Sequence, residues 1–401
     1  MTRKQSEREL EQLQQNLEYA GWELKVFVAD IISPGEAARE AMKDRMIELE
    51  NLVNTYGGVV ILKHIQNKTS PDYNTFIGEG RLDDIIEEME RELANVLIFW
   101  NILKSQQIYK INEKLRGIWA KAWDRVDLIL KIFEKNANSK EAKIQIELAA
   151  IKHMWPRIFG MWMELSKQWW WVGSRWKWET NTEIMKRHLS KKEAFLKKEL
   201  EHFKKVRSQH RQSMIRKGLH TAGVVGYTNA GKSTLTNVLT KKGVLAEDKL
   251  FATLWTSVGK MWLPTPDGRG KEVLINDTIW FIRDLPPNLI EAFSSTLEDS
   301  IESQVILHVI DASDPKLWEK IEVVEEILTN IWAKQKRIYV FNKIDELSED
   351  EFEIEIDGEI KKYINKLEYL KEVYTYLEPV FISAGKKIWL EELKDRIVNE
   401  L

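Results

Sequence analysis

The stretch GYTNAGKS, from Gly226 to Ser233, constrains the fold of this chain more than any other. It fits the pattern G-x-x-x-x-G-K-[ST], in which glycine-rich backbone curls around phosphate groups just before a helix begins. The apolar run 222–225 in front of it predicts a buried strand, and Leu235, Val238 and Leu239 follow at helical spacing. A strand, a phosphate loop and a helix in this order predict an α/β domain whose sheet is mostly parallel, with helices on both faces.

Each residue type in this loop has a chemical task. Successive backbone N–H groups, beside the positive end of the following helix, favour bound phosphate. We expect Lys232 to reach the β- and γ-phosphates and the Ser233 hydroxyl to ligate Mg²⁺. The predicted phosphate-binding residues are Gly226, Tyr227, Thr228, Asn229, Ala230, Gly231, Lys232, Ser233 and Thr234. The alternative is a chance glycine turn before a helix, and the agreement of loop and flanking elements argues against it.

Two later segments predict which base is bound. Asn342, Lys343 and Asp345 belong to an N-K-x-D sequence that directly follows the apolar run 338–341. A carboxylate at Asp345 can accept hydrogen bonds from both N1–H and the 2-amino group of guanine, a donor pair that adenine lacks. Ser383 and Ala384 follow another strand-like run and suit backbone contact with the base. Either segment alone could be an ordinary turn or strand end, but after a P-loop the two together favour GTP over ATP.

Residues between these segments are expected to sense the γ-phosphate. Asp277 follows a short apolar strand and is predicted to hold Mg²⁺ through water, whereas Thr253, favoured over Thr256, is the candidate hydroxyl ligand. The usual pattern D-x-x-G places a glycine N–H on the γ-phosphate, but Trp280 occupies that position here, followed by Phe281. The predicted catalytic residues are therefore Lys232, Thr253, Asp277 and Trp280, and the predicted metal ligands are Ser233, Thr253 and Asp277. Because a phenyl ring cannot orient water, we expect slow intrinsic hydrolysis that a partner stimulates.

Five segments in chain order resemble the G domain of HflX GTPases: GYTNAGKSTL, EDKLFATL, DTIWFIRDLP, EAFSSTLED and HVIDASDP. Upstream, YNTFIGEGRLDDI, SQQIYKINEKL and DRVDLILKIF are similar to motifs of the same family. The resemblance spans residues 25–395. It implies a ribosome-associated GTPase that hydrolyses GTP to GDP, uses Mg²⁺, and has the large ribosomal subunit and ribosomal RNA as partners.

Six tryptophans stand where the family has glycine, and so regular a set indicates either an altered or engineered chain or a sequence that differs from that of the natural protein. Five of them, Trp169, Trp170, Trp171, Trp176 and Trp178, lie in the family's glycine-rich loop, and the sixth is Trp280. A stacking platform for bases or an interfacial membrane anchor is the weaker interpretation of the cluster. Trp at position 280 resists the positive φ that glycine allows and would crowd the γ-phosphate. An alternative function is therefore a guanine-nucleotide-binding module with impaired hydrolysis.

The chain divides into three predicted regions: a small parallel α/β domain at 1–137, a helical hairpin at 138–217 with the Trp loop at 166–180, and the G domain at 218–401. Within the first region, the segment FIGEGRL has two interpretations. It is either an ordinary turn at the start of a helix or a second site for phosphate or nucleic acid. In the hairpin, one helix is expected to begin after Ser139 and stop near Pro156, and its partner to span 180–217. The partner's polar face is rich in Lys and Arg, which suits either a solvated surface or RNA phosphate, and hence an RNA-binding nucleotide switch.

The composition sets broad limits. The net charge is −3, so any nucleic-acid surface must be local, and the absence of cysteine fits a reducing cytoplasm. Apolar residues make up 43% of the chain, without a signal-peptide pattern or a run long enough to span a membrane. We expect a cytoplasmic monomer built from several α/β domains.

Overall fold

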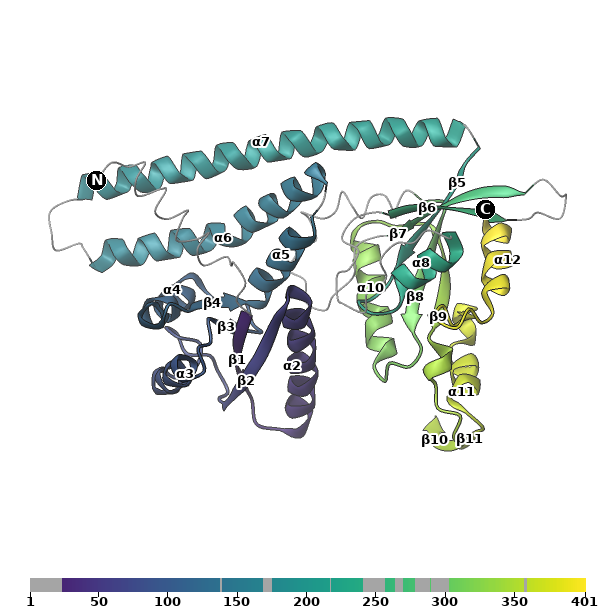
Figure 1. The fold of residues 1–401 in the computed structure, drawn as a ribbon, viewed down its shortest axis with the longest axis horizontal. Coiled ribbons are helices and arrows are strands. Elements are labelled where there is room, and N and C mark those ends of the chain that lie inside the picture. The colour runs from purple at the N-terminus through teal and green to yellow at the C-terminus, as the bar shows by residue number, and fades with distance from the viewer. Residues whose placement is uncertain are drawn as a thin grey trace. The chain divides into compact units, whose positions relative to one another are not determined.

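The computed structural model describes residues 24–137, 139–168, 175–216, 218–240, 257–263, 270–277, 289, 303–356 and 359–401. The chain forms two compact units, Met1–Leu128 with Arg157–Glu164, and Ile129–Pro156 with Leu165–Leu401. The domain boundaries expected at 137 and 217 remain predictions. The predicted class, an α/β chain of several domains with a parallel N-terminal sheet and a mostly parallel G-domain sheet, is confirmed (Figure 1).

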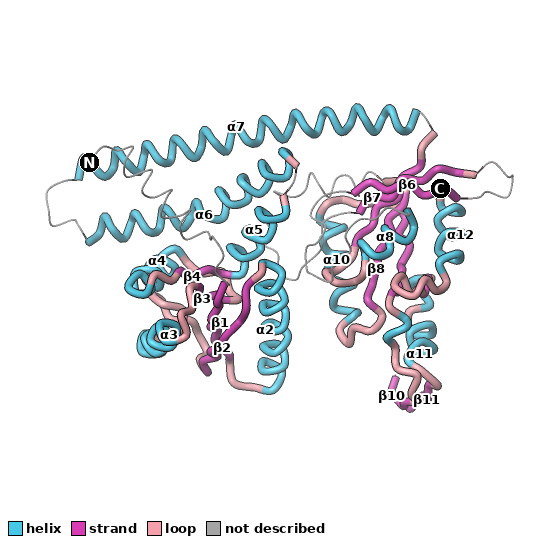
Figure 2. The backbone as a smooth tube through the Cα atoms, viewed as in Figure 1, coloured by secondary structure: helices cyan, strands magenta, loops and turns pink. Residues whose placement is uncertain are grey.

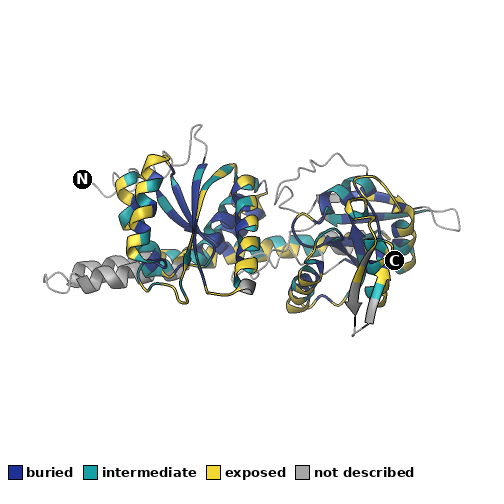
Figure 3. Ribbon diagram, turned by 90° about the horizontal axis from the view of Figure 1, so that it is seen from below, coloured by how far each residue is buried: buried dark blue, intermediate teal, exposed yellow. Residues whose placement is uncertain are grey.

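The first unit contains a four-stranded sheet in the order β2-β1-β3-β4, parallel throughout. Its elements are β1 (Leu24–Ile32), α2 (Glu36–Tyr56), β2 (Gly58–Asn67), α3 (Glu79–Arg91), β3 (Val96–Phe99), α4 (Ser105–Leu115), β4 (Lys121–Asp124) and the start of α5 (Arg125–Asn136). Apolar residues of α3 and α4 pack on β1 and β3 in one core that includes Phe27, Leu82 and Ile111. Alternating strands and helices therefore produce the small parallel sheet that the sequence predicts, with its buried strands between helices (Figure 3).

The G domain is built on a six-stranded sheet in the order β12-β9-β8-β5-β7-β6, in which only the β6–β7 pair is antiparallel. Its strands are β5 (His220–Val225), β6 (Ser257–Leu263), β7 (Lys271–Asp277), β8 (Val305–Asp311), β9 (Lys336–Asn342) and β12 (Val380–Phe381). Its helices are α8 (Lys232–Thr240), α10 (Leu317–Asn330), α11 (Lys366–Val373) and α12 (Leu390–Glu400). A two-stranded ribbon, β10 (Phe352–Ile356) with β11 (Glu359–Tyr363), was not anticipated from the sequence (Figure 2).

Helices cover both faces of this sheet. Leu235 of α8 and Leu393 of α12 pack in one core cluster with the β-strands. Val324 of α10 and Leu370 of α11 belong to separate clusters that also contain strand residues. The loops that follow β5, β8, β9 and β12 all leave the sheet at its carboxyl edge, because these strands are parallel.

The hairpin pairs α6 (Lys140–Gln168) with α7 (Arg175–Arg216). Ile144, Leu148, Ile151 and Leu196 form its core, with Leu200 and Phe203 packed against them. Ser139 caps α6 as expected, since its hydroxyl accepts from the Ala142 backbone N–H at 3.1 Å. Lys140 Nζ lies 3.3 Å from Glu199 and Lys192 Nζ 2.5 Å from Glu147, which fits an antiparallel pair.

Two predicted helix ends are wrong. α6 does not stop near Pro156 but continues to Gln168, although proline has no N–H to donate to the carbonyl one turn earlier. α7 begins at Arg175 rather than at 180, so Trp176 and Trp178 lie in helical backbone. Tryptophan tolerates a helix, whereas glycine at these positions would disfavour one. No helix among the described residues is long and apolar enough to cross a membrane.

Candidate nucleotide-binding site

The P-loop turns sharply out of β5 because two glycines adopt conformations that side chains disfavour. Gly226 has φ 151°, and a Cβ there would lie 2.2 Å from the Val309 carbonyl oxygen of β8. Gly231 has φ 86°, and a Cβ there would lie 2.2 Å from Asn342 Nδ2. Both glycines are therefore required for the loop to approach the neighbouring strand ends this closely.

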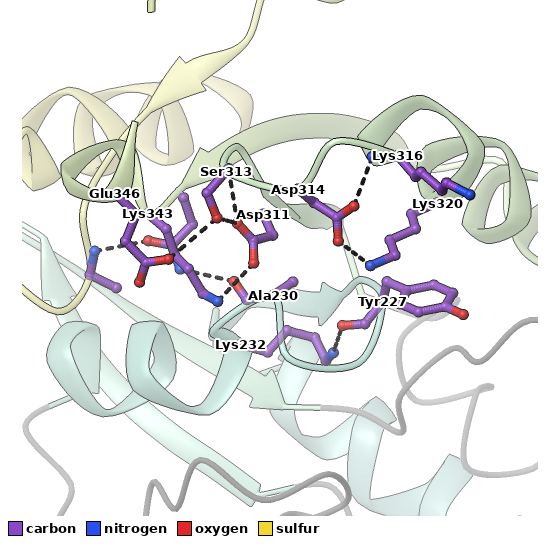
Figure 4. A network of polar contacts seen from close by, with 12 residues as sticks. Tyr227, Ala230, Lys232, Asp311, Ser313, Asp314, Lys316, Lys320, Lys343 and Glu346 are labelled. Atoms are coloured by element: carbon purple, nitrogen blue, oxygen red, sulfur yellow. Dashed lines mark hydrogen bonds and ion pairs between the residues drawn. The ribbon is translucent and has the colours of Figure 1, made fainter. Parts of the chain in front are cut away.

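Lys232 points back into the loop that precedes it. Its side chain is 1% exposed, and Nζ donates to the carbonyl oxygens of Gly226 at 2.7 Å and Tyr227 at 2.6 Å. Burying an ammonium is costly unless it is hydrogen-bonded, so these carbonyls hold the charge at the centre of the loop. Figure 4 shows Lys232 beneath Tyr227. Phosphate oxygens are acceptors of the kind that this charge is placed to meet.

The remaining loop residues differ in exposure. Ser233, the predicted Mg²⁺ ligand, is 6% exposed in the first turn of α8. Tyr227, Thr228 and Ala230 are buried, Thr234 is half-buried, and Asn229 is exposed with a left-handed φ of 64°. The loop thus presents backbone rather than bulky side chains along most of its length.

Asn342 joins the P-loop to the base-binding segments. Its Nδ2 donates to the Ala230 carbonyl at 2.9 Å, and its Oδ1 accepts from the Ala384 backbone N–H at 2.9 Å. Asn342 is 2% exposed, so both bonds are sheltered from water. The structure therefore brings together three segments that the sequence places far apart.

The base-reading residues lie at the same edge of the sheet. Asp345 is exposed in a short 3-10 helix, Ile344–Glu346, which follows directly from β9. Ser383 is buried, and its hydroxyl accepts from the Lys386 backbone N–H at 3.0 Å. Ser383 and Ile388 also exchange backbone hydrogen bonds, which closes the loop after β12. The exposed Asp345 side chain is therefore accessible to a ligand at this edge.

Two residues in this cluster were not predicted. Asp311 ends β8 and lies 2.7 Å from Lys343 Nζ, and Ser313 donates to the same Asp311 carboxylate. In the sequence, the segment HVIDASDP stands out only by its family resemblance. A carboxylate at the end of a parallel strand, beside the strands of the P-loop and the N-K-x-D motif, is the signal that could have identified it.

A polar network centred on the buried His308 lies behind the P-loop, on β8, β9 and α10. His308 Nδ1 lies 3.1 Å from Glu325 Oε1, which also accepts from the Tyr339 hydroxyl at 3.2 Å. Arg337 Nε is 3.2 Å from the other Glu325 oxygen. Burial lowers the pKa of His308, an effect that its bond to Glu325 opposes. Burial disfavours the charged form of Tyr339 as well, and for a tyrosine this raises the pKa, here to about 12.

Several predicted residues lie outside the described part of the chain, and for Asp277 only the backbone is described. Thr253, Thr256, Trp280 and Phe281 lie there, as do Trp169, Trp170 and Trp171. The backbone of Asp277 is described at the end of β7, where it pairs in register with Val224 of β5. This places Asp277 one strand away from the start of the P-loop.

Comparison with known proteins agrees with this geometry. Residues 43–134 match the family described as GTP-binding GTPase N-terminal, and residues 136–214 match the GTP-binding GTPase middle region. Residues 221–343 match the family described as 50S ribosome-binding GTPase.

Curated relatives cover most of the chain. GTPase HflX of Caldanaerobacter subterraneus subsp. tengcongensis is 37% identical over 380 residues, which is 94% of this chain and 81% of the relative. GTPase HflX of Escherichia coli K12 is 36% identical over 315 residues, or 78% of this chain and 72% of the relative. The solved complex of SsGBP with GDP has a TM-score of 0.53 and 26% identity, and the match covers 94% of this chain and 98% of that one. The chain therefore belongs to the HflX family, and it is a GTPase that binds guanine nucleotide and hydrolyses GTP.

Proposed function

We propose that this GTPase works with Mg²⁺ in the cytoplasm as a monomer and acts on the large ribosomal subunit, in ribosome dissociation or rescue. One observation carries the ribosomal part: residues 221–343 match a family described as 50S ribosome-binding GTPase. The exposed basic face of α7 supports it, because ribosomal RNA is a polyanion that such a face can bind.

The proposed nucleotide pose follows from the site. The P-loop amides and the buried Lys232 hold the β- and γ-phosphates, and Asp345 accepts from the guanine edge. Ser383 and Ala384 border the base, while Asn342 fixes the distance between the phosphate and base ends of the site. Catalysis in this arrangement consists of positioning and charge neutralisation, since no side chain forms a covalent bond.

The residues present also suit a magnesium ion. Ser233 is buried beside Lys232, and the backbone of Asp277 ends β7, the strand next to β5, so the chain brings a serine and an aspartate to neighbouring strands of the sheet. Hard oxygen donors of this kind are what Mg²⁺ prefers. Thr253 is proposed as a further ligand. When bound, the ion would neutralise charge on the β- and γ-phosphates.

The proposed RNA surface lies on α7. Lys191, Lys198 and Lys205 are exposed and stand seven residues apart, so they share one helix face at intervals of about 10 Å. Neighbouring cations are engaged otherwise: Lys192 pairs with Glu147, and Lys197 pairs with Glu193 at 2.8 Å. The seven-residue row is therefore an exposed part of the basic face that phosphate can reach.

GTP turnover measured with and without added 50S subunits tests this function. We expect stimulation by the subunits, and weaker binding with a shallower salt slope when Lys191, Lys198 and Lys205 are replaced together by Ala. Lys192→Ala is the matched control, because its ammonium already has a partner. Turnover that 50S subunits leave unchanged, or binding that is insensitive to salt, would refute the proposal.

Impaired hydrolysis is the second candidate, and Trp280 at the γ-phosphate position favours it. A bulky residue there should weaken binding of a non-hydrolysable GTP analogue while leaving GDP binding intact. Trp280→Gly should then restore both analogue binding and turnover. Equal turnover in the two chains would show that Trp280 does not limit the reaction.

A further inference from the structure

A group of residues at the end of β8 closes around Lys343, next to the predicted guanine-reading Asp345. Lys343 Nζ lies 2.7 Å from Asp311 Oδ2, and the two side chains are 21% and 16% exposed. Asp311 is fixed in turn by Ser313, whose backbone N–H and Oγ donate to its other oxygen at 3.0 and 2.5 Å. Figure 4 shows the three side chains converging beside Ala230 of the P-loop. A half-buried, oriented carboxylate thus holds the lysine.

The backbone of Lys343 is constrained as well. It adopts a left-handed conformation with φ 64° and ψ 34°, which a residue with a Cβ disfavours. The Ala312 backbone N–H donates to the Asn342 carbonyl at 2.9 Å. The segment at the end of β8 therefore contacts the backbone before Lys343 through Ala312 and the Lys343 side chain through Asp311. Strain of this kind persists only where the surroundings enforce it, and it concentrates at functional sites.

We propose that Asp311 is a positioning residue of the guanine subsite. By anchoring the Lys343 ammonium, it keeps the aliphatic part of that side chain fixed as a wall beside the base and ribose. The inference rests on the proposed placement of guanine at Asp345. Asp311 itself does not touch the base edge, so its effect must pass through Lys343 and must be the same for every nucleotide that shares the ribose and diphosphate.

A double-mutant cycle on GDP affinity tests this assignment, with Asp311→Asn, Lys343→Met and the double variant titrated with fluorescent GDP. Each single variant should bind GDP about five- to tenfold more weakly, and the double variant no more weakly than Lys343→Met alone. GDP and IDP, which lacks the 2-amino group, should lose affinity by the same factor in Asp311→Asn. The KM for GTP should rise more than kcat falls, and Asp311→Glu should restore part of the affinity.

Asp350→Asn is the matched control. This exposed aspartate also accepts from a nearby serine, Ser348, at 3.0 Å, but it lies away from Lys343 in the chain and should leave GDP affinity unchanged. Wild-type affinity in Asp311→Asn, or a full further loss in the double variant, would overturn the assignment. If Asp345→Ala and Lys343→Met both bind GDP normally, the placement of guanine itself fails, and this inference fails with it.

A second, independent observation concerns two tryptophans that end helical segments. Trp332 follows α10 with φ 60°, its N–H donates to the Thr329 carbonyl at 3.0 Å, and the Ala333 N–H donates to the Leu328 carbonyl at 2.9 Å. This pair of bonds is the Schellman closure, whose left-handed position is usually glycine.

Trp119 repeats the arrangement after α4 and its final 3-10 turn. It has φ 59°, its N–H donates to the Arg116 carbonyl at 3.4 Å, and the Ala120 N–H donates to the Leu115 carbonyl at 3.3 Å. Trp119 and Trp332 are 71% and 79% exposed, so little indole burial offsets the strained backbone. Gly57 has the left-handed cap after α2, although Leu93 shows that a side chain can be accommodated after α3.

We infer that the natural protein carries glycine at positions 119 and 332, and at the six family-glycine positions that include 280. A single codon can encode either residue. UGA is a stop in the standard code, but some genetic codes read it as tryptophan and others as glycine. A host that reads UGA as glycine would make a protein without strained caps and with the γ-phosphate glycine in place. Trp123 is different, because it is buried with its ring 6.0 Å from Tyr56 in an edge-on contact, as a true tryptophan would be.

Sequencing the gene and the native protein tests this inference. We expect UGA codons at 119, 280 and 332 and UGG at 123, and peptide masses from the source cells that correspond to glycine at the first three positions. UGG codons at 119 and 332, or tryptophan masses there, would overturn it. In the recombinant chain, Trp332→Gly should raise the melting temperature, whereas Trp318→Gly should lower it, because Trp318 lies in α10 and stacks 6.1 Å from Tyr374.

Discussion

The two parallel sheets of this chain share a topological feature but differ in the charge they place at it. In each, the strand order reverses at the first strand: β1 lies between β2 and β3, and β5 lies between β8 and β7. Ligands of open α/β sheets bind at the carboxyl ends of strands at such a point. At β5 the buried charge is the Lys232 ammonium, whereas at β1 it is the Asp30 carboxyl group, which is 0% exposed.

The environment of Asp30 is unlike a phosphate site. Its Oδ1 accepts from the Ile31 backbone N–H at 2.8 Å and from Asn101 Nδ2 at 3.0 Å, while Oδ2 has no partner among the described residues. Burial raises the pKa of Asp30 to about 6. The comparison teaches that strand order alone does not make a nucleotide site. The glycine loop and a buried cation are what distinguish β5.

The sharpest test of this contrast is to add one methyl group at each sheet. Gly226→Ala should reduce GDP affinity by at least about 100-fold, because the new Cβ would meet the Val309 carbonyl at 2.2 Å. Gly35→Ala, in the loop after β1, should leave GDP affinity unchanged, since nothing lies within 4 Å of a Cβ there despite its φ of 140°. Titration with GDP measures both, and equal losses would contradict the comparison.

The charge difference is tested next through Asp30→Asn. The folded pKa of about 6 lies above the unfolded value of 3.8, so the folded state binds the proton more tightly. Ionisation therefore costs stability as pH rises from about 4 to 6, and the cost persists above that range. Asp30→Asn should raise the free energy of unfolding at pH 8 by about 1–3 kcal/mol, and by much less at pH 4.5. Urea denaturation at the two pH values measures this, and a loss of stability at both would contradict it.

His308 predicts the opposite pH response in the G domain. Its folded pKa is lowered, so the unfolded state binds the proton more tightly and stability is lost as pH falls below 6.5. His308→Asn should remove about 2–4 °C of the drop in melting temperature between pH 7.5 and 5.5. Glu325→Gln is a useful companion, because loss of the carboxylate removes the contact that opposes the His308 shift and should steepen the acid response. An unchanged pH profile in His308→Asn would rule out this group as the cause.

Sequence patterns predict the local parts of this molecule well. The strand–loop–helix order around Gly226 and the β/α alternation of the first unit depend on short-range periodicity, and both appear in the structure. The cap at Ser139 is equally local. These features need no knowledge of what lies far away in the chain.

Features that depend on tertiary contacts were missed. The two bonds of Asn342, to Ala230 and Ala384, join residues separated by 112 and 42 positions. The pairing of Asp311 with Lys343 likewise requires β8 and β9 to lie side by side. Pro156 was expected to end a helix because local rules disfavour proline inside one, yet α6 continues past it to Gln168.

The double contact of Asn342 has a consequence for the evolution of this site. The Asn342 side chain hydrogen-bonds to both the P-loop and the loop after β12. The phosphate end and the base end of the nucleotide site are therefore held together and would move together. A change that adapts the pocket to another base would shift the amide and, with it, the loop that grips phosphate. Base specificity and phosphate affinity are thus coupled traits, and substitutions that alter one would need compensation in the other.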